Sequence, residues 1–314
     1  MKTAFSASLR GRVLLSVLLL APAFAATGSQ ARSSADLVLL GSDGSELQFE
    51  DLEDLLEFLR NARVVSSKTL GQGITKAEKV LIENQGVTAH VIFHDVDEYE
   101  QRMKRLPNGR LVFFVRDSFT GQIAAYELGR MLEIDNIPPT VERRIKRSRG
   151  SAQLWIENAM TEEDRRDKDI EPPDYNVWNQ RYADMRVFDN LINNIDRNMG
   201  NVLMDRFGNL WMIDHTRAFG RDRSLPRPEL VTRCSRGLFS KIRGLDKQEV
   251  RDRLSRYLRN SELEALFSRR DKLVTLLDER IAEKGEEWVL FEFGSSDPGI
   301  VVESSAIGPD PENF

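Results

Sequence analysis

The chain has 314 residues, of which 40% are hydrophobic and 30% charged, and its formal net charge is −5. This is the composition of an ordinary globular protein with one large domain or two closely joined lobes, and the acidic balance argues against a general nucleic-acid-binding function. The single cysteine, Cys234, excludes an intramolecular disulfide and gives no sign of a thiolate metal site.

The first 25 residues have the layout of a secretory signal peptide. Lys2, Arg10 and Arg12 form a basic leader, residues 13–24 form an apolar run, and residues 23–25 give a small–x–small cleavage site. The alternative, an N-terminal membrane anchor, needs about 20 apolar residues, which is more than this run provides. We therefore expect an exported protein, periplasmic or secreted, with no membrane span after signal cleavage.

Residues 26–62 form a small, polar leader followed by an amphipathic helix. Leu52, Leu55 and Leu59 recur at helical spacing, which predicts the helix at 50–62. The segment that follows is rich in strand-like runs and turn signals. The elements expected in it are strands at 79–82, 87–93 and 111–115, a helix at 122–132, and a hairpin formed by 140–145 and 152–156.

The turn of that hairpin carries a run of basic residues, namely Arg143, Arg144, Lys146, Arg147 and Arg149. A solvated turn between two strands is the simpler interpretation of such a run. A docking patch for an acidic partner is the alternative.

The second half of the chain is mostly helical in pattern. A link at 157–160 and a charged loop at 161–174 precede it, and a flexible tail is expected at 294–314. The elements expected between them are a helix at 178–191, strands at 202–204 and 210–213, and helices at 246–259 and 262–284. This order predicts an α+β protein with two lobes and a cleft between them.

Three oxygen-bearing side chains carry the strongest chemical signal. Asp196 follows a long predicted helix, Asn201 lies five residues later, and Asp214 ends the next predicted hairpin. Phosphoryl transfer needs one carboxylate to accept the acceptor's hydroxyl proton, and it needs an amide oxygen and a second carboxylate to hold divalent cations. The alternative is that Asp196 and Asn201 only cap turns, which both residue types do readily.

Three blocks of sequence, in the right order, resemble atypical kinases of the secretory-pathway Golgi casein kinase family, which are related to phosphatidylinositol kinase-like folds. The blocks are QIAAYEL at 122–128 followed by IPPTV at 137–141, FDNLINNIDRNMGN at 188–201, and MIDHTRAFG at 212–220. The last block is similar to that family's metal-binding segment, where Asp-His replaces the usual Asp-Phe-Gly. The resemblance implies a kinase-like fold with a β-rich N-lobe at 63–156 and a helical C-lobe at 157–293.

The resemblance also implies a set of site residues for ATP and Mg²⁺ or Mn²⁺. It makes Asp196 the catalytic aspartate and Arg197 the residue that orients its loop, with Asn201 and Asp214 as metal ligands. It places Gly71 and Gly73 in the loop that covers the phosphates. It places residues 155–159, including Glu157, in the hinge that meets the adenine.

Two positions depart from the family pattern. His94 stands where the family has a phosphate-contacting lysine, and Gln122 stands where it has the glutamate that holds this lysine. A histidine with an ordinary pKa near 6.5 is mostly neutral at pH 7, so it cannot fully replace an ammonium group. Either Glu127 does the pairing, or Lys79 or Lys76 reaches the phosphates from the neighbouring strand, or the protein binds nucleotide without efficient transfer.

Two functions follow from these observations. One is an exported phosphotransferase that moves a phosphoryl group from ATP to a hydroxyl group of a protein or a carbohydrate. The other is a nucleotide-binding pseudokinase that acts as a regulatory or binding module. The three histidines, His90, His94 and His215, do not form a pattern typical of a zinc site, and nothing supports a Ser-His-Asp hydrolase.

Overall fold

The structure, a computed structural model, describes residues 37–70, 77–100, 104–105, 111–112 and 115–296. The expected signal peptide, the site candidates Gly71, Gly73 and Lys76, and residues 297–314 of the expected tail lie outside these residues. Within the described part of the chain, no helix is long and apolar enough to cross a membrane.

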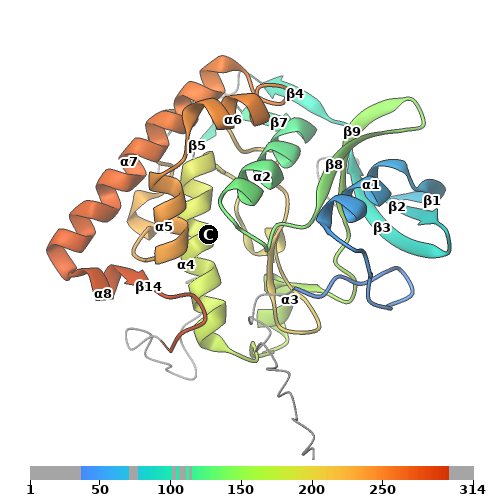
Figure 1. Ribbon diagram of the computed structural model, residues 1–314, viewed down its shortest axis with the longest axis horizontal. Helices are drawn as coiled ribbons and strands as arrows, with labels where there is room; N and C mark the ends of the chain where they lie inside the picture. Colours follow the sequence, from blue (N-terminus) through green and yellow to red (C-terminus); the bar gives the residue numbers. More distant parts are fainter. Residues whose placement is uncertain (1–36, 71–76, 101–103, 106–110, 113–114, 297–314) are drawn as a thin grey trace, which may run out of the picture. The chain divides into compact units, whose positions relative to one another are not determined.

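A five-stranded antiparallel sheet forms the centre of the N-terminal half, in the order β1–β2–β3–β9–β8 (Figure 1). Its strands are β1 (Arg63–Thr69), β2 (Glu78–Asn84), β3 (Val87–His94), β8 (Thr140–Ile145) and β9 (Ser148–Leu154). Two short antiparallel pairs follow β3, namely β4 (Asp97–Glu100) with β7 (Val115–Ser118) and β5 (Lys104–Arg105) with β6 (Leu111–Val112).

The β2–β3 hairpin shows how the sequence sets the register of the sheet. Gln85 and Gly86 form its turn with φ of 51° and 83°, the left-handed pair that a tight two-residue hairpin requires. On one face, Val80 lies opposite Val91, and both are fully buried. A slip of one residue would turn this apolar face outward, so burial fixes the pairing.

Two helices pack against β8 and β9 of this sheet, α1 (Leu52–Asn61) and α2 (Phe119–Met131). The Asp51 side chain caps α1 by accepting from the Asp54 N–H (3.0 Å). The Ser118 side chain caps α2 by accepting from the Thr120 N–H (3.2 Å). This cap starts α2 three residues before the predicted position 122, because apolar spacing alone does not reveal an N-cap serine.

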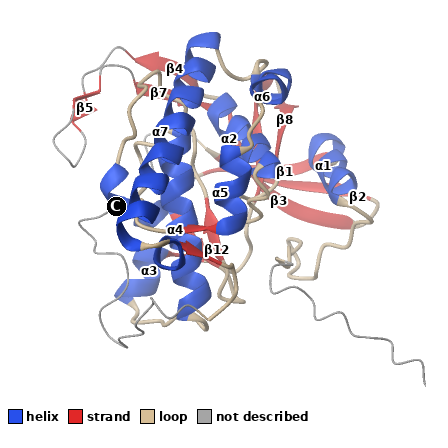
Figure 2. Ribbon diagram, turned by 60° about the vertical axis from the view of Figure 1, so that its left-hand side comes forward, coloured by secondary structure: helices blue, strands red, loops and turns tan. Residues whose placement is uncertain are grey.

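The C-terminal half is built on α4 (Tyr175–Ile192) and α7 (Asn260–Lys284), which contact each other, with α5 (Arg236–Arg243) against α7 (Figure 2). A three-stranded antiparallel sheet consists of β10 (Met160–Thr161), β11 (Val202–Met204) and β12 (Leu210–Met212). The remaining elements are α3 (Glu162–Asp167), the 3₁₀ turns η1 (Met199–Asn201) and η2 (Pro228–Leu230), α6 (Lys247–Leu254), α8 (Glu286–Val289), and the parallel pair β13 (Cys234–Ser235) and β14 (Leu290–Phe291).

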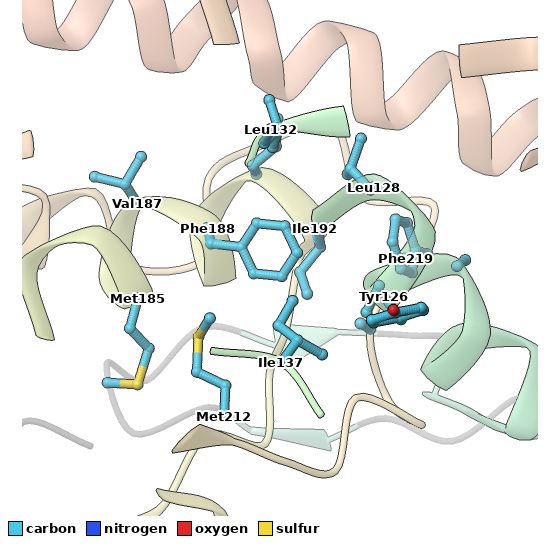
Figure 3. Packing of buried hydrophobic residues seen from close by; sticks show 14 of the residues in the cluster. Tyr126, Leu128, Leu132, Ile137, Met185, Val187, Phe188, Ile192, Met212 and Phe219 are labelled. Atoms are coloured by element: carbon cyan, nitrogen blue, oxygen red, sulfur yellow. The ribbon is translucent and has the colours of Figure 1, made fainter. Parts of the chain in front are cut away.

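A continuous apolar core joins the strand-rich and helical halves. Figure 3 shows Phe188 and Ile192 of α4 in one buried cluster with Leu128 of α2, Met212 of β12 and Phe219. Ile192 and Val202 flank residues 193–201, and Met212 and Phe219 flank residues 213–218, so the core anchors both of these segments at each end.

Most of the predicted elements are present, with some corrections. The loop predicted at 161–174 is wrong in its first part, because α3 lies there. Thr161 caps α3 by accepting from the Asp164 N–H (3.0 Å), and buried Glu162 pairs with Arg165 (2.6 Å) and Arg166 (2.7 Å). The charged residues that led to the prediction of a loop therefore form ion pairs with one another within one helix.

Other differences concern boundaries and missed elements. The helix predicted at 246–259 ends at Leu254, and β1 and α5 are not among the predicted elements. At the start of the predicted flexible tail, the Gly294 N–H donates to the Gln180 side chain (2.7 Å), and the Ser295 carbonyl accepts from Gln180 (3.0 Å).

The basic run at 143–149 lies on the β8–β9 hairpin, as predicted. Arg143 donates to the carbonyl oxygens of Leu59 (2.7 Å) and Ala62 (2.9 Å) at the end of α1. Lys146 pairs with Glu78 (2.9 Å), and Arg149 pairs with Glu142 (2.5 Å). These contacts within the protein favour the interpretation as a hairpin turn over a docking patch.

The contact between α4 and β13 predicts a pH-dependent stability. The Asp184 side chain accepts from the Ser235 N–H (2.8 Å), and burial raises its pKa from the ordinary 3.8 to about 6. The folded protein therefore holds this proton to a higher pH than the unfolded chain does. The stabilisation is complete below about pH 4 and is lost as the pH rises to about 6.

We expect Asp184→Asn, which keeps an acceptor and cannot ionise, to gain about 1–3 kcal/mol of stability relative to wild type between pH 4 and pH 6. Urea unfolding across this range measures the difference, and Asp252→Asn, at an exposed position on α6, is the control. A difference between Asp184→Asn and wild type that does not change with pH would contradict the assignment.

Candidate active site

The predicted catalytic loop leaves the C-terminal end of α4. Asn193 ends the helix in the left-handed conformation (φ 55°), a conformation that asparagine adopts more readily than most residues. Asn194 donates to Asp189 (2.9 Å) and accepts from the Asp196 N–H (3.2 Å), so it shapes the loop that carries Asp196. The loop then passes through η1 into β11, which brings Asn201 next to the β11–β12 hairpin.

Arg197 is the hub of this loop. Its guanidinium group donates to both carboxylate oxygens of Asp189 (2.8 and 3.0 Å), to the carbonyl oxygens of Asn201 (2.6 Å) and Ile213 (2.9 Å), and to Nε2 of His215 (3.0 Å). These contacts use all five N–H groups of an arginine. They tie the end of α4, the catalytic loop and the segment that carries Asp214 into one unit.

His215 acts as a neutral acceptor in this unit. Burial lowers its pKa well below the ordinary value, and the charge of Arg197 lowers it further. Its Nε2 faces the guanidinium group of Arg197, so the ring proton belongs on Nδ1. The His215 N–H donates to the side chain of Gln122 (2.7 Å), which links α2 to the same segment.

The structure brings Asp196, Asn201 and Asp214 onto this single loop and hairpin. The Asn201 amide donates to the Asp196 carbonyl oxygen (2.9 Å), and the Ile213 N–H donates to the Asn201 carbonyl oxygen (3.2 Å). Asp214 is held with φ at 54°, the left-handed region, and Thr216 donates to its Oδ1 (2.9 Å). A non-glycine residue in this region is strained, and such strain occurs often at functional sites.

Arg217 and Asp117 join the set, although the sequence interpretation gave neither a role. Arg217 donates through Nη1 to Asp196 Oδ2 (2.8 Å) and through Nε to Asp117 Oδ2 (3.1 Å). Burial opposes its charge, but Asp196, Asp117 and Asp214 outweigh burial and raise its pKa above the ordinary value. Arg217 lies in the sequence block at 212–220 that resembles the kinase family. Asp117 lies about 80 residues from Asp196 in the sequence, and no local sequence pattern points to it.

His94 is the last residue of β3, and it lies close enough to Asp214 for the charge of that carboxylate to act on its ring. Burial lowers its pKa, against the charges of Asp214, Asp117 and Asp95, so the ring is neutral near pH 7. Its backbone passes close to Gly150, where an added Cβ would lie 2.2 Å from the His94 carbonyl oxygen. Only glycine at position 150 permits this approach.

Lys79 and Glu157 contact each other at the segment predicted to be the hinge. Lys79 Nζ lies 3.7 Å from Glu157 and 4.1 Å from the centre of the Trp155 ring, and Glu157 also lies 2.5 Å from His90 Nδ1. Glu157 lines a small cavity together with residues 38–40 and the β11–β12 turn. Among the described residues, no hydrogen bond or ion pair joins Lys79 or Glu157 to Asp196, Asn201 or Asp214.

Glu127, the alternative partner for a lysine, lies elsewhere. It pairs with Arg253 of α6 (2.8 Å) and lies 3.8 Å from Arg130 on its own helix. The residue of α2 that contacts the Asp214 segment is Gln122. Gly121 helps this approach, because a Cβ there would lie 3.0 Å from the His215 carbonyl oxygen.

The donor set suits a hard divalent cation that also binds phosphate. Asp214 supplies a carboxylate, and Asn201, whose amide nitrogen is used by Asp196, offers its amide oxygen. Within the described residues, no three His, Cys, Asp or Glu side chains form a metal cluster. A site for Mg²⁺ needs only one or two carboxylates when substrate phosphates complete the coordination.

Comparisons of the structure identify the fold. A Fam20 protein of hydra, solved with sugar, has a TM-score of 0.57 and 15% identity, over 79% of this chain and 95% of that chain. The Golgi casein kinase, solved with Mn and ADP bound, has a TM-score of 0.56 and 15% identity, over 76% of this chain and 78% of that chain. No family model and no curated protein matches the sequence.

At this identity the likeness establishes the fold. The chain has the α+β kinase-like fold of the atypical secretory-pathway kinases, with a β-rich N-terminal half and a helical C-terminal half. Asp196 follows α4 and Asp214 follows the β11–β12 hairpin, which is the order expected from the sequence resemblance.

The hub predicts a large loss of stability on removal of Arg197. Arg197→Leu would leave the carboxylate of Asp189 buried without its cation, which costs about 3–5 kcal/mol. Chemical denaturation measures this change. Arg206→Leu, at an exposed position of the β11–β12 turn, is the matched control and should change stability by less than about 0.5 kcal/mol. Equal stability of the two variants would show that Arg197 is not the hub.

Proposed function

We propose that this chain is an exported, periplasmic or secreted, phosphotransferase that moves the γ-phosphoryl group of ATP to a hydroxyl group of a protein or a carbohydrate. The observation that carries the proposal is the arrangement of Asp196, Asn201 and Asp214 on one loop and hairpin locked by Arg197. The kinase-like fold supports it, as do the bound Mn and ADP of the Golgi casein kinase and the sugar of the hydra Fam20 protein.

In the proposed reaction, Asp196 accepts the proton of the acceptor hydroxyl. The acceptor oxygen forms a bond to the γ-phosphorus while the bond from this phosphorus to the β–γ bridging oxygen breaks. ADP leaves with that electron pair. Asp196 suits this role because its loop is fixed by Asn194 and Asn201, while its side chain remains 25% exposed.

Asn201 and Asp214 would hold the divalent cation. Mg²⁺ or Mn²⁺ bound there would offset the negative charge of the β- and γ-phosphates. The contribution of the chain is to fix both ligands, through the Arg197 contacts to the backbone of Asn201 and of Ile213, the residue before Asp214.

A nucleotide-binding pseudokinase is the second candidate. His94 is neutral, and Gln122 is bonded to the His215 backbone, so neither supplies the ion pair that typical kinases use. In that case the chain binds nucleotide and regulates a partner without transfer.

Label transfer from [γ-³²P]ATP tests the first candidate. With Mg²⁺ or Mn²⁺ present, and with dephosphorylated casein and mixed oligosaccharides as acceptors, we expect Asp196→Asn to lower the rate about 10²–10⁴-fold, since it removes the base. Asp214→Asn and EDTA should also abolish transfer. The matched control, Asp167→Asn at an exposed position of α3, should transfer as wild type does.

Nucleotide titration separates the two candidates. Equal labelling by wild type and by both site variants would exclude transfer at this site. Metal-dependent nucleotide binding without any labelling would establish the pseudokinase. A wild-type chain that binds no nucleotide would refute both.

A further inference from the structure

The candidate site is rich in negative charge. Asp117, Asp196 and Asp214 all act on one guanidinium group, that of Arg217. ATP would bring further negative charge to the same place. His94 and Gln122, at the positions where the kinase pattern has its ion pair, carry no positive charge there. A phosphate-binding site needs a cation, so the charge has to come from another side chain or from the metal alone.

Arg197 is not available for this purpose. All five of its N–H groups donate to protein acceptors. Lys79 lies at the hinge with Glu157 and Trp155. Arg197 and Lys79 are therefore both engaged by protein groups, and Lys76, the other lysine considered above, lies outside the described residues.

Arg217 differs from Arg197 in this respect. It uses one N–H at Nε for Asp117 and one at Nη1 for Asp196, and the side chain is 19% exposed. An arginine has five N–H groups, so the contacts with described residues leave three, one on Nη1 and two on Nη2. The Nη edge is the part of a guanidinium group that binds phosphate oxygens in pairs.

We propose that Arg217 is the phosphate-contacting cation of this site and that Asp117 is the residue that positions it. The proposal rests on the proposed function, because it needs a nucleotide beside Asp214. Asp117 holds the Nε edge, and Asp196 holds one Nη1 hydrogen. Arg217 thereby stands between the base and the phosphates, and its free edge contacts the nucleotide phosphates.

Binding of ATP and of adenosine to the full mature chain tests this role. We expect Arg217→Met to weaken ATP binding in the presence of Mg²⁺ by about 10–100-fold and to leave adenosine binding unchanged, since only ATP carries phosphates. The ATP affinity of Arg217→Lys, which keeps the charge and loses the forked guanidinium group, should lie between the affinities of wild type and of Arg217→Met. Arg223→Met, at an exposed position of the same segment, is the control.

The outcomes separate this proposal from the proposed function. If wild type binds ATP and transfers phosphate, and Arg217→Met binds ATP equally well, Arg217 has no phosphate contact and only the present proposal fails. A higher rate of phosphoryl transfer in Arg217→Met than in wild type would show instead that Arg217 restrains Asp196. This result would also overturn the present proposal. Equal losses for ATP and adenosine, or a lowered melting temperature in both Arg217 variants, would mean a structural role and would overturn it as well.

A double-mutant cycle tests the positioning role of Asp117. Asp117→Asn should weaken ATP binding in the wild-type background and have no further effect in Arg217→Met, because Asp117 acts through that arginine. A gain of ATP affinity of similar size in both backgrounds would show direct repulsion of phosphate by Asp117, and would refute positioning.

Discussion

The buried pair of Arg197 and Asp189 is the constraint on which the rest of the site depends. Taking two charges out of water is costly, and it is tolerated when every donor finds an acceptor. Here the acceptors are the Asp189 carboxylate, two backbone carbonyl oxygens and one neutral histidine. The geometry that satisfies Arg197 is therefore the same geometry that places residues 196–201 beside the segment that carries Asp214.

The neutral side chain at position 122 is part of the same packing. Gln122 is 2% exposed and accepts the His215 N–H, while the Ser118 N–H donates to the Thr216 carbonyl oxygen (2.9 Å). A glutamate at 122 would bury a charge beside a backbone amide and a neutral histidine, and no cation among the described residues bonds to this side chain. Uncharged hydrogen bonds therefore join α2 and the residue before it to the segment that carries Asp214.

The sequence predicts the parts of the site that are local. The spacing of Asp196, Asn201 and Asp214 is readable because one loop and one hairpin carry all three, and the α4 helix before them has a clear apolar period. The role of Asp117 could not be predicted from the sequence, because only the packing of β7 beside the backbone of residues 216–217 brings Asp117 to Arg217. The ion pair between Glu127 and Arg253 likewise depends on tertiary packing, and helical spacing in the sequence could not predict it.

The two arginines show why residue type alone is a weak guide to function. Arg197 and Arg217 stand in the two most informative motifs, and both contact aspartates. Their difference lies in how many N–H groups the protein itself consumes. Arg197 has none left, whereas the contacts of Arg217 with described residues leave its Nη edge for the phosphate contact that we propose. With the phosphate contact that we propose for Arg217, a neutral histidine at position 94 does not by itself imply an inactive protein.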